Sequence, residues 1–108
     1  MNMEKLPSQF ESKEEKREKL IEALKERVDA PETRELLLAW VDEEEKIANA
    51  EKSAIGRIEM ARRMARLYRE AGLNEMTVLS LEDAAEQAWQ ERQDDLYREI
   101  MEELRGVR

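Results

Sequence analysis

The densest cluster of chemically competent side chains in the sequence is the acidic run 42–45, Asp-Glu-Glu-Glu. Clustered carboxylates are the ligands that Mg²⁺ and Ca²⁺ prefer. The run lies in a helical pattern, however, where successive side chains point about 100° apart around the axis. Four consecutive carboxylates therefore diverge instead of converging on one ion. The pattern favours a solvated helix face, and we predict no metal site and no bound cofactor.

A second arrangement of carboxylates pairs acidic residues three positions apart. All-α nucleoside-triphosphate pyrophosphohydrolases hold Mg²⁺ with Glu-x-x-Glu and Glu-x-x-Asp motifs on facing helices, and the spacing is similar here at Glu11/Glu14 and Glu26/Asp29. Both pairs fall on the most polar predicted helix, where we expect no pocket. Among 27 acidic residues such pairs also arise by chance. A Mg²⁺-dependent nucleotide hydrolase is therefore the second alternative function.

The sequence contains no histidine and no cysteine. It thus lacks the commonest acid–base group, the commonest transition-metal ligand and any disulfide. It also has no glycine-rich phosphate loop and no serine nucleophile motif. We accordingly predict no catalytic residue and a protein that is not an enzyme.

Basic residues concentrate between two acidic stretches. Residues 55–70 carry 5 basic and 2 acidic side chains, whereas 71–108 carry 4 basic and 10 acidic. One helix face there carries three arginines that can bind an anion or RNA: Arg62, Arg66 and Arg69. The net charge of −8 opposes nucleic-acid binding, so we favour pairing inside the fold. The acidic partners that we expect are Glu82, Asp83, Glu86 and the run 42–45. A binder of nucleic acid or an anionic ligand is the first alternative.

The composition predicts an all-α protein. Of 108 residues 43% are charged, and three glycines and two prolines leave little turn material. Exposed charge pairs suit helices, so we expect one helical domain at 9–108 after a frayed segment 1–8. No apolar stretch is long enough to span a membrane. Residues 1–10 lack the pattern of a secretory signal, and we expect a cytoplasmic protein.

Capping signals place the first helix at 9–28. Capping boxes begin at Ser8 and Ser12, each with a glutamate three positions later. The first half of this helix is almost entirely polar. The residues able to face a core are Phe10, Leu20, Ile21, Ala23, Leu24 and Val28. Pro31 then starts the next helix, with Asp29 or Ala30 as its cap.

The stretch 32–71 reads as one long helix, or as two that meet near Ser53–Gly56. Apolar residues of 58–68 span about half the helical circumference, against about 100° for a surface helix. We therefore predict that 58–71 is the most buried helix. Gly72 should end it with positive φ, and Leu73 should pack back onto it.

Two shorter helices follow, at 75–90 and 95–105. Asn74 is the expected cap of the first, which should bury Val78, Leu81, Ala85, Ala88 and Trp89. The apolar stripe then shifts around the helix by more than helical drift explains, so we predict a break across Glu91–Asp95. Asp94 or Asp95 should cap the last helix.

The stretch 61–84 contains a large–small pair, an aromatic, a turn glycine and a second large–small pair. These residues are Met64, Ala65, Tyr68, Gly72, Leu81 and Ala84. Their spacing resembles a tetratricopeptide-type helical hairpin, and the resemblance implies a surface that binds peptides or proteins. Thr77 departs from the small residue that the family has on its second helix. No second copy lies 34 residues upstream, and the resemblance covers less than a quarter of the chain.

These features predict a bundle of four or five helices built from helical hairpins. Helices 75–90 and 95–105 are too short to cover both 58–68 and the apolar side of 32–55. Residues 20–28 or a second copy of the chain must cover the rest, and we predict a symmetric homodimer. The expected interface comprises Leu37, Trp40, Val41 and Ile47. The favoured function is therefore a self-associating protein–protein interaction or assembly module.

The two tryptophans, Trp40 and Trp89, are the largest apolar side chains of this aromatic-poor sequence. We interpret both as core anchors, because a buried tryptophan removes the most apolar surface from water. Anchoring a helix–helix or oligomer interface is the alternative role.

Overall fold

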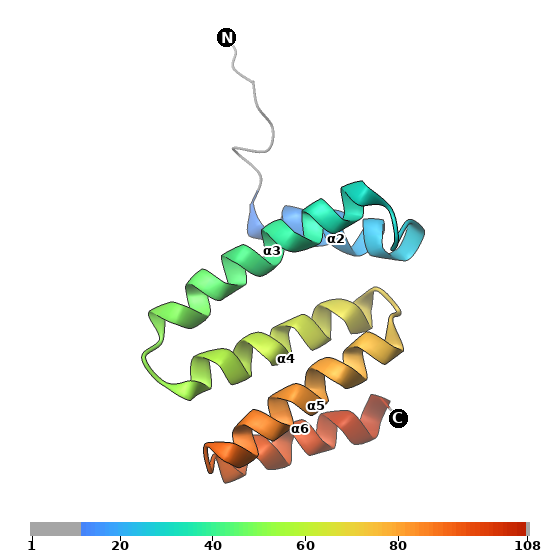
Figure 1. Ribbon diagram of the computed structural model, residues 1–108. Helices are drawn as coiled ribbons and strands as arrows, with labels where there is room; N and C mark the ends of the chain where they lie inside the picture. Colours follow the sequence, from blue (N-terminus) through green and yellow to red (C-terminus); the bar gives the residue numbers. More distant parts are fainter. Residues whose placement is uncertain (1–11, 108) are drawn as a thin grey trace.

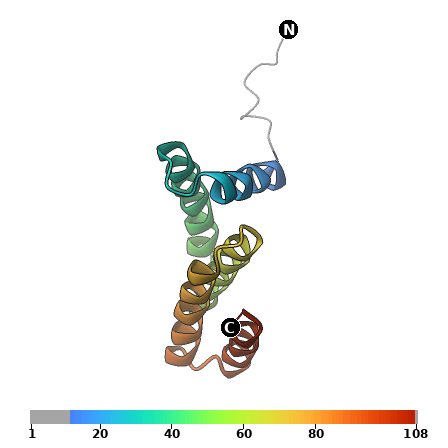
Figure 2. The same ribbon diagram turned by 90° about the vertical axis from the view of Figure 1, so that its right-hand side faces the viewer.

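The computed structural model describes residues 12–107, which form five α-helices and no strand (Figure 1). They are α2 (Lys13–Glu26), α3 (Pro31–Ala50), α4 (Ala54–Glu70), α5 (Asn74–Gln90) and α6 (Asp94–Val107). Helices α3 to α6 follow one another as hairpins, and α2 lies across α3 at the far end from α6 (Figures 1 and 2). The predicted all-α bundle of four or five helices is confirmed. The segment 1–8, the capping box at Ser8 and Phe10 lie outside the described residues.

Helix α2 begins at the predicted second capping box. The Ser12 hydroxyl accepts the Glu15 N–H at 3.1 Å, and the Glu15 carboxylate accepts the Ser12 N–H at 2.9 Å. The buried residues of α2 all lie in its second half: Leu20, Ile21, Ala23 and Leu24. Val28, expected to face the core, is 43% exposed because the helix has already ended at Glu26.

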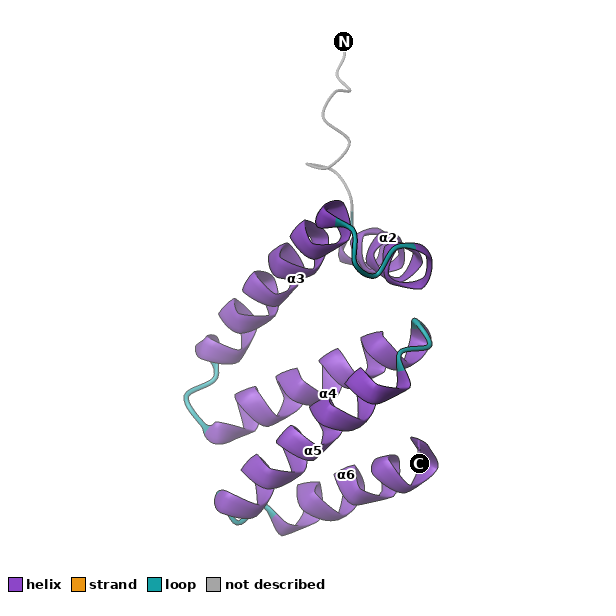
Figure 3. Cartoon of the chain, turned by 45° about the vertical axis from the view of Figure 1, so that its right-hand side comes forward, coloured by secondary structure: helices purple, strands orange, loops and turns teal. Residues whose placement is uncertain are grey.

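The stretch 32–71 forms two helices that fold back on each other (Figure 3). Helix α3 starts with Pro31 after an Ala30 cap, as predicted, and ends at Ala50, three residues before the predicted junction at Ser53–Gly56. Gly56 explains where the chain turns. A Cβ there would lie 2.6 Å from the Glu51 Cβ and 2.7 Å from the Ala48 carbonyl oxygen. The turn thus depends on a glycine that lets α4 approach the end of α3.

Helix α4 is the centre of the fold. Seven of its residues are buried, more than in any other described helix. One side packs with α2 and α3 around Leu67, and the other with α5 and α6 around Ile58. Both residues have no exposed surface. The predicted central position of 58–71 is confirmed, because two separate clusters meet on this one helix.

The turn after α4 has the predicted glycine terminator. Gly72 has φ of +80°, and the Leu73 N–H bonds to the Tyr68 carbonyl at 2.9 Å. Leu73 packs against the α2–α3–α4 cluster, as expected. The prediction that Asn74 caps α5 is wrong, because Asn74 is already the first helical residue. The Leu73 carbonyl instead accepts both the backbone N–H and the hydroxyl of Thr77, at 3.0 and 2.9 Å.

The predicted break between the last two helices is also present. Helix α5 ends at Gln90 and α6 begins at Asp94, so Asp94 and Asp95 lie inside the first turn of α6. Arg92 occupies the left-handed conformation with φ of +58°, and the Gln93 N–H bonds to the Ala88 carbonyl at 2.8 Å. This turn has the same hydrogen-bond pattern as the one at Gly72, but without a glycine.

Candidate interaction surface

The predicted arginine face consists of one buried, paired residue and two exposed ones. Arg62 is largely buried, with its side chain 10% exposed, and its guanidinium lies 3.2–3.3 Å from three carboxylates: Glu59, Glu99 and Glu103. Burial lowers the pKa of Arg62, but the hydrogen bond to Glu103 and the three negative charges outweigh it and leave the pKa raised. Arg66 is exposed and reaches Glu103 at 3.7 Å, and Arg69 is exposed. Two of these carboxylates, Glu99 and Glu103, come from α6, which the sequence pattern did not indicate as a partner of Arg62.

The predicted dimer residues divide between core and surface. Trp40 is 7% exposed and packs inside the chain against Leu20 and its neighbours on α2, with the Lys13 ammonium 5.4 Å from the indole centre. Leu37 and Val41 are half-buried against the same cluster. The placement of Trp40 at an exposed seam is therefore wrong, because α2 covers that side of α3.

Ile47, the fourth predicted interface residue, belongs to an exposed apolar edge of α3. It is 43% exposed, and Leu36, eleven positions earlier, is 41% exposed. Eleven residues make three helical turns, so both side chains lie on the same edge, about 16 Å apart. Between them the edge carries Ala39 and Glu43, both exposed. Leu36 was not predicted as an interface residue. Its spacing of eleven positions from Ile47 could have indicated that both lie on one edge of α3.

A groove between α2 and α3 adjoins this edge. Its volume is about 420 Å³. The floor is apolar, with Leu20, Leu36, Ala39 and Trp40. Lys16 and Lys19 from α2 form one rim, and Asp42 and Glu43 from α3 form the other. The groove lies where α2 crosses α3, a crossing that Figure 2 shows. We call the groove and the edge from Leu36 to Ile47 the α2–α3 face.

Ion pairs fix α2 in the position that shapes this groove. Glu44, only 1% exposed, accepts a 2.6 Å hydrogen bond from Arg63 Nε and lies 3.2 Å from Lys13 Nζ. These contacts join α2, α3 and α4. The prediction that the run 42–45 forms a solvated helix face is therefore wrong at Glu44, which is buried and faces α4.

A second clamp joins α2 to the end of α4. Arg17 donates two hydrogen bonds to Glu70, at 3.0 and 2.8 Å. The hydrogen bond from Arg17 lowers the pKa of Glu70, and the same bond raises the pKa of Arg17. A bidentate pair of this kind restricts orientation as well as distance, so the first two turns of α2 are held against α3 and α4.

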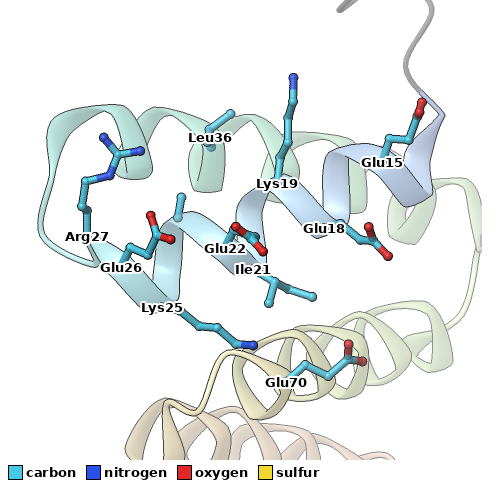
Figure 4. A pocket seen from close by; sticks show the side chains of 11 residues that line it. Glu15, Glu18, Lys19, Ile21, Glu22, Lys25, Glu26, Arg27, Leu36 and Glu70 are labelled. Atoms are coloured by element: carbon cyan, nitrogen blue, oxygen red, sulfur yellow. The ribbon is translucent and has the colours of Figure 1, made fainter.

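The other side of α2 carries a larger and more open hollow of about 830 Å³. Figure 4 shows its charged side chains, Glu18, Glu22, Glu26 and others, spread along the helix without meeting at a point. Within residues 12–107 no group of three or more Asp or Glu side chains is placed to hold a metal ion. Leu36 lines both this hollow and the groove.

Trp89 is 68% exposed, so its assignment as a core anchor is wrong. It lies next to buried Ala88, about 100° away around α5. Helix α6 covers the side of α5 that carries Ala88, and the indole lies outside that contact. Among the described residues, the aromatic ring that the indole contacts is Tyr97, at a centroid distance of 5.7 Å. This tryptophan–tyrosine pair is a second, smaller exposed apolar feature.

Comparisons of the chain with protein-family models, with curated proteins and with solved structures gave no match. Among residues 12–107, no helix is both long and apolar enough to cross a membrane.

Proposed function

We propose that this protein is a non-catalytic assembly module that pairs with a second copy of itself through the α2–α3 face. The observation that carries this proposal is the apolar edge from Leu36 to Ile47 beside a groove with rims of opposite charge. An apolar floor with a polar rim is the usual anatomy of a protein interface. The preformed shape of the groove also limits the entropy lost on binding.

The expected affinity is low. Burying a Leu or Ile side chain completely contributes about 1.5–3 kcal/mol. Leu36 and Ile47 are each about 40% exposed, so four such side chains in a dimer contribute roughly 3 kcal/mol. Association costs at least about 4 kcal/mol in lost freedom. The filled groove and the charged rims must supply the remainder, and we expect dissociation constants in the micromolar range or weaker.

Neither alternative function has comparable support. An arginine-based anion binder loses its central residue, because Arg62 is enclosed by three carboxylates. A Mg²⁺-dependent hydrolase has no carboxylate cluster in its favour among residues 12–107. The tetratricopeptide-like spacing at 61–84 is compatible with an interaction module. A chain without cysteine gains nothing from an oxidising compartment, and we propose the cytoplasm as its location.

The proposal is tested by measuring solution mass against concentration. Sedimentation from low micromolar to about 1 mM should show the native mass rising towards two chains. Ile47→Glu should remain a single chain, because a carboxylate would be buried in the interface without a partner. Leu79→Glu is the matched control, since Leu79 is 64% exposed on α5 and should leave the association unchanged. A native mass of one chain throughout would refute the proposal.

A further inference from the structure

We infer that the exposed side of α5 between Leu79 and Trp89 is a docking surface for a basic amphipathic helix of another protein. Leu79 is 64% exposed and Trp89 is 68% exposed, the two highest values among the large apolar side chains of residues 12–107. The two lie ten positions apart, which is about 15 Å along the helix. Single exposed apolar residues are normal on a protein surface, whereas several on one face mark an interaction site.

Five exposed residues form this side of α5, which we call the α5 face. Successive helical residues are turned by about 100°, so Glu82 and Glu86 fall between Leu79 and Trp89 within an arc of about 80°. Glu75 lies in the same arc, four positions before Leu79. All five side chains are exposed. The α5 face therefore presents two apolar anchors with carboxylates between and beside them.

The charge of the α5 face indicates the chemistry of the partner. Helix α5 carries four carboxylates and no basic residue, whereas each of the other four described helices carries at least two basic residues. Glu82 already has an interaction within the protein, but Glu75 and Glu86 have no ion-pair partner among residues 12–107. These two carboxylates are open to lysine or arginine side chains of a partner. The net charge of −8 also attracts a cationic partner over a longer range.

A helix is the partner conformation that fits the length of the α5 face. Apolar residues eleven positions apart on a helix lie on one edge, about 16 Å from each other. That distance suits the spacing of Leu79 and Trp89, and basic residues one and two turns after the first anchor then lie over the carboxylates. Amphipathic helices are commonly recognised through apolar anchors of this kind. Nucleic acid and anionic lipid, in contrast, are repelled by the carboxylates.

Trp89 is held in an orientation that favours such a contact. Its indole packs on the half-buried Tyr97 of α6 at a centroid distance of 5.7 Å. A hollow of about 510 Å³ lies beside the indole and is also lined by Gln90, Arg92 and Asp94. This hollow gives room for one large apolar side chain of the partner, and the indole face attracts a cation as well. An aromatic side chain that is already packed on a neighbour loses little freedom on binding.

The α5 face is separate from the α2–α3 face, because the two share no residue and lie on different helices. Binding of a basic helix therefore goes beyond self-association and does not depend on it. Ile47→Glu, expected to remain a single chain, should bind the basic helix as the native chain does. Trp89→Ala should self-associate as the native chain does. Failure of one activity thus leaves the other standing.

A synthetic helical peptide of about 18 residues is the probe for the α5 face. It carries two leucines three turns apart with lysines between them on an alanine background, and a second peptide has alanine in place of both leucines. Acrylamide quenching of tryptophan fluorescence reports binding, because Trp89 is exposed whereas Trp40 is only 7% exposed. The leucine peptide should protect Trp89 from quenching, and it should bind at least about tenfold more tightly than the alanine peptide.

Variants of the chain locate the bound peptide, with calorimetry as the measurement and circular dichroism as the check of folding. Glu86→Lys and Trp89→Ala should each weaken binding of the leucine peptide at least about tenfold. Glu35→Lys is the matched control, because it makes the same charge change at an exposed carboxylate near the start of α3 that has no ion-pair partner among residues 12–107. Its affinity should stay within about threefold of the native value.

Three results would overturn the docking surface. The first is a native chain that does not bind the leucine peptide at about 1 mM. The second is an equal loss of affinity in Glu35→Lys and Glu86→Lys, because the peptide would then respond only to the overall charge. The third is unchanged affinity in a helical Trp89→Ala chain, which would place the peptide elsewhere on the protein.

Discussion

Replacement of Glu44 by glutamine tests whether its buried carboxylate holds α2, α3 and α4 together. Glu44 is 1% exposed, with Arg63 Nε at 2.6 Å and Lys13 Nζ at 3.2 Å. A hydrogen bond between charged groups contributes about 1.5–3 kcal/mol, roughly twice a neutral one. Glutamine keeps a single acceptor oxygen and turns an N–H donor towards a cation.

The expected loss follows from the exposure of the two partners. The Arg63 contact, one third exposed, should weaken by about 1 kcal/mol as it becomes a bond to a neutral acceptor. The Lys13 contact, half exposed on the lysine side, should lose up to about 1 kcal/mol. Glu44→Gln should therefore reduce the free energy of unfolding by about 2 kcal/mol.

Urea denaturation followed by circular dichroism measures this change, and a loss of this size should also lower the melting temperature by roughly 10 °C. Glu43→Gln is the matched control, because its neighbouring side chain is exposed and should change stability by less than about 0.5 kcal/mol. If Glu44→Gln unfolds at the same urea concentration as the native chain, the three-helix clamp has no energetic role and our account of how α2 is positioned is wrong.

Two further predictions concern a turn and an ion pair. Gly72→Ala should lower the free energy of unfolding by about 1 kcal/mol, because φ of +80° disfavours any side chain. Steric conflict is not the reason, since no atom lies within 4 Å of the added Cβ. Gly106→Ala, in equally open space inside α6, should be neutral or stabilising in the same melt, and an equal loss in both would exclude the backbone explanation. The lowered pKa of Glu70 means that its pair with Arg17 stabilises the fold above the ordinary carboxyl pKa of 4.5, and that this contribution disappears as pH falls through the lowered pKa. Glu70→Gln should therefore be less stable than the native chain by up to about 1 kcal/mol at pH 7, with the difference closing in strong acid. If the stability difference between Glu70→Gln and the native chain stays the same at every pH, the pair with Arg17 is not the source of that difference.

Local features of the fold were predictable because they depend on residues within one or two turns. The Ser12 capping box, Pro31 at the start of α3 and Gly72 with positive φ all involve neighbours in the chain. The wide apolar arc of α4 was likewise readable, since a helix with two buried sides needs apolar residues on both. The turn at 51–53 was misplaced because Glu51 and Lys52 are ordinary helix formers. Glu51 nevertheless takes an extended conformation that ends α3, and Gly56 then lets α4 approach the end of α3 closely, a contact between helices that local propensity does not indicate.

The candidate site was only partly predictable. Ile47 was named and is exposed, whereas Trp40 was named and is buried, because the sequence did not say which side of α3 the second half of α2 would cover. The lysine rim of the groove was not foreseen at all. Lys16 and Lys19 belong to a helix whose polar face carries no distinctive pattern. They form a groove rim only because the fold places them opposite Asp42 and Glu43.

By itself, then, the sequence determined the helices, most of their ends and the central place of α4, because hydrogen bonding and capping act over a few residues and apolar periodicity is visible along the chain. The tertiary structure decided which of two similar positions became core or surface. Trp40 and Trp89 are the same residue type on amphipathic helices, yet one is 7% and the other 68% exposed. The difference comes from where α2 crosses α3 and α6 lies on α5, and such crossings depend on side-chain packing and ion pairs between residues distant in sequence.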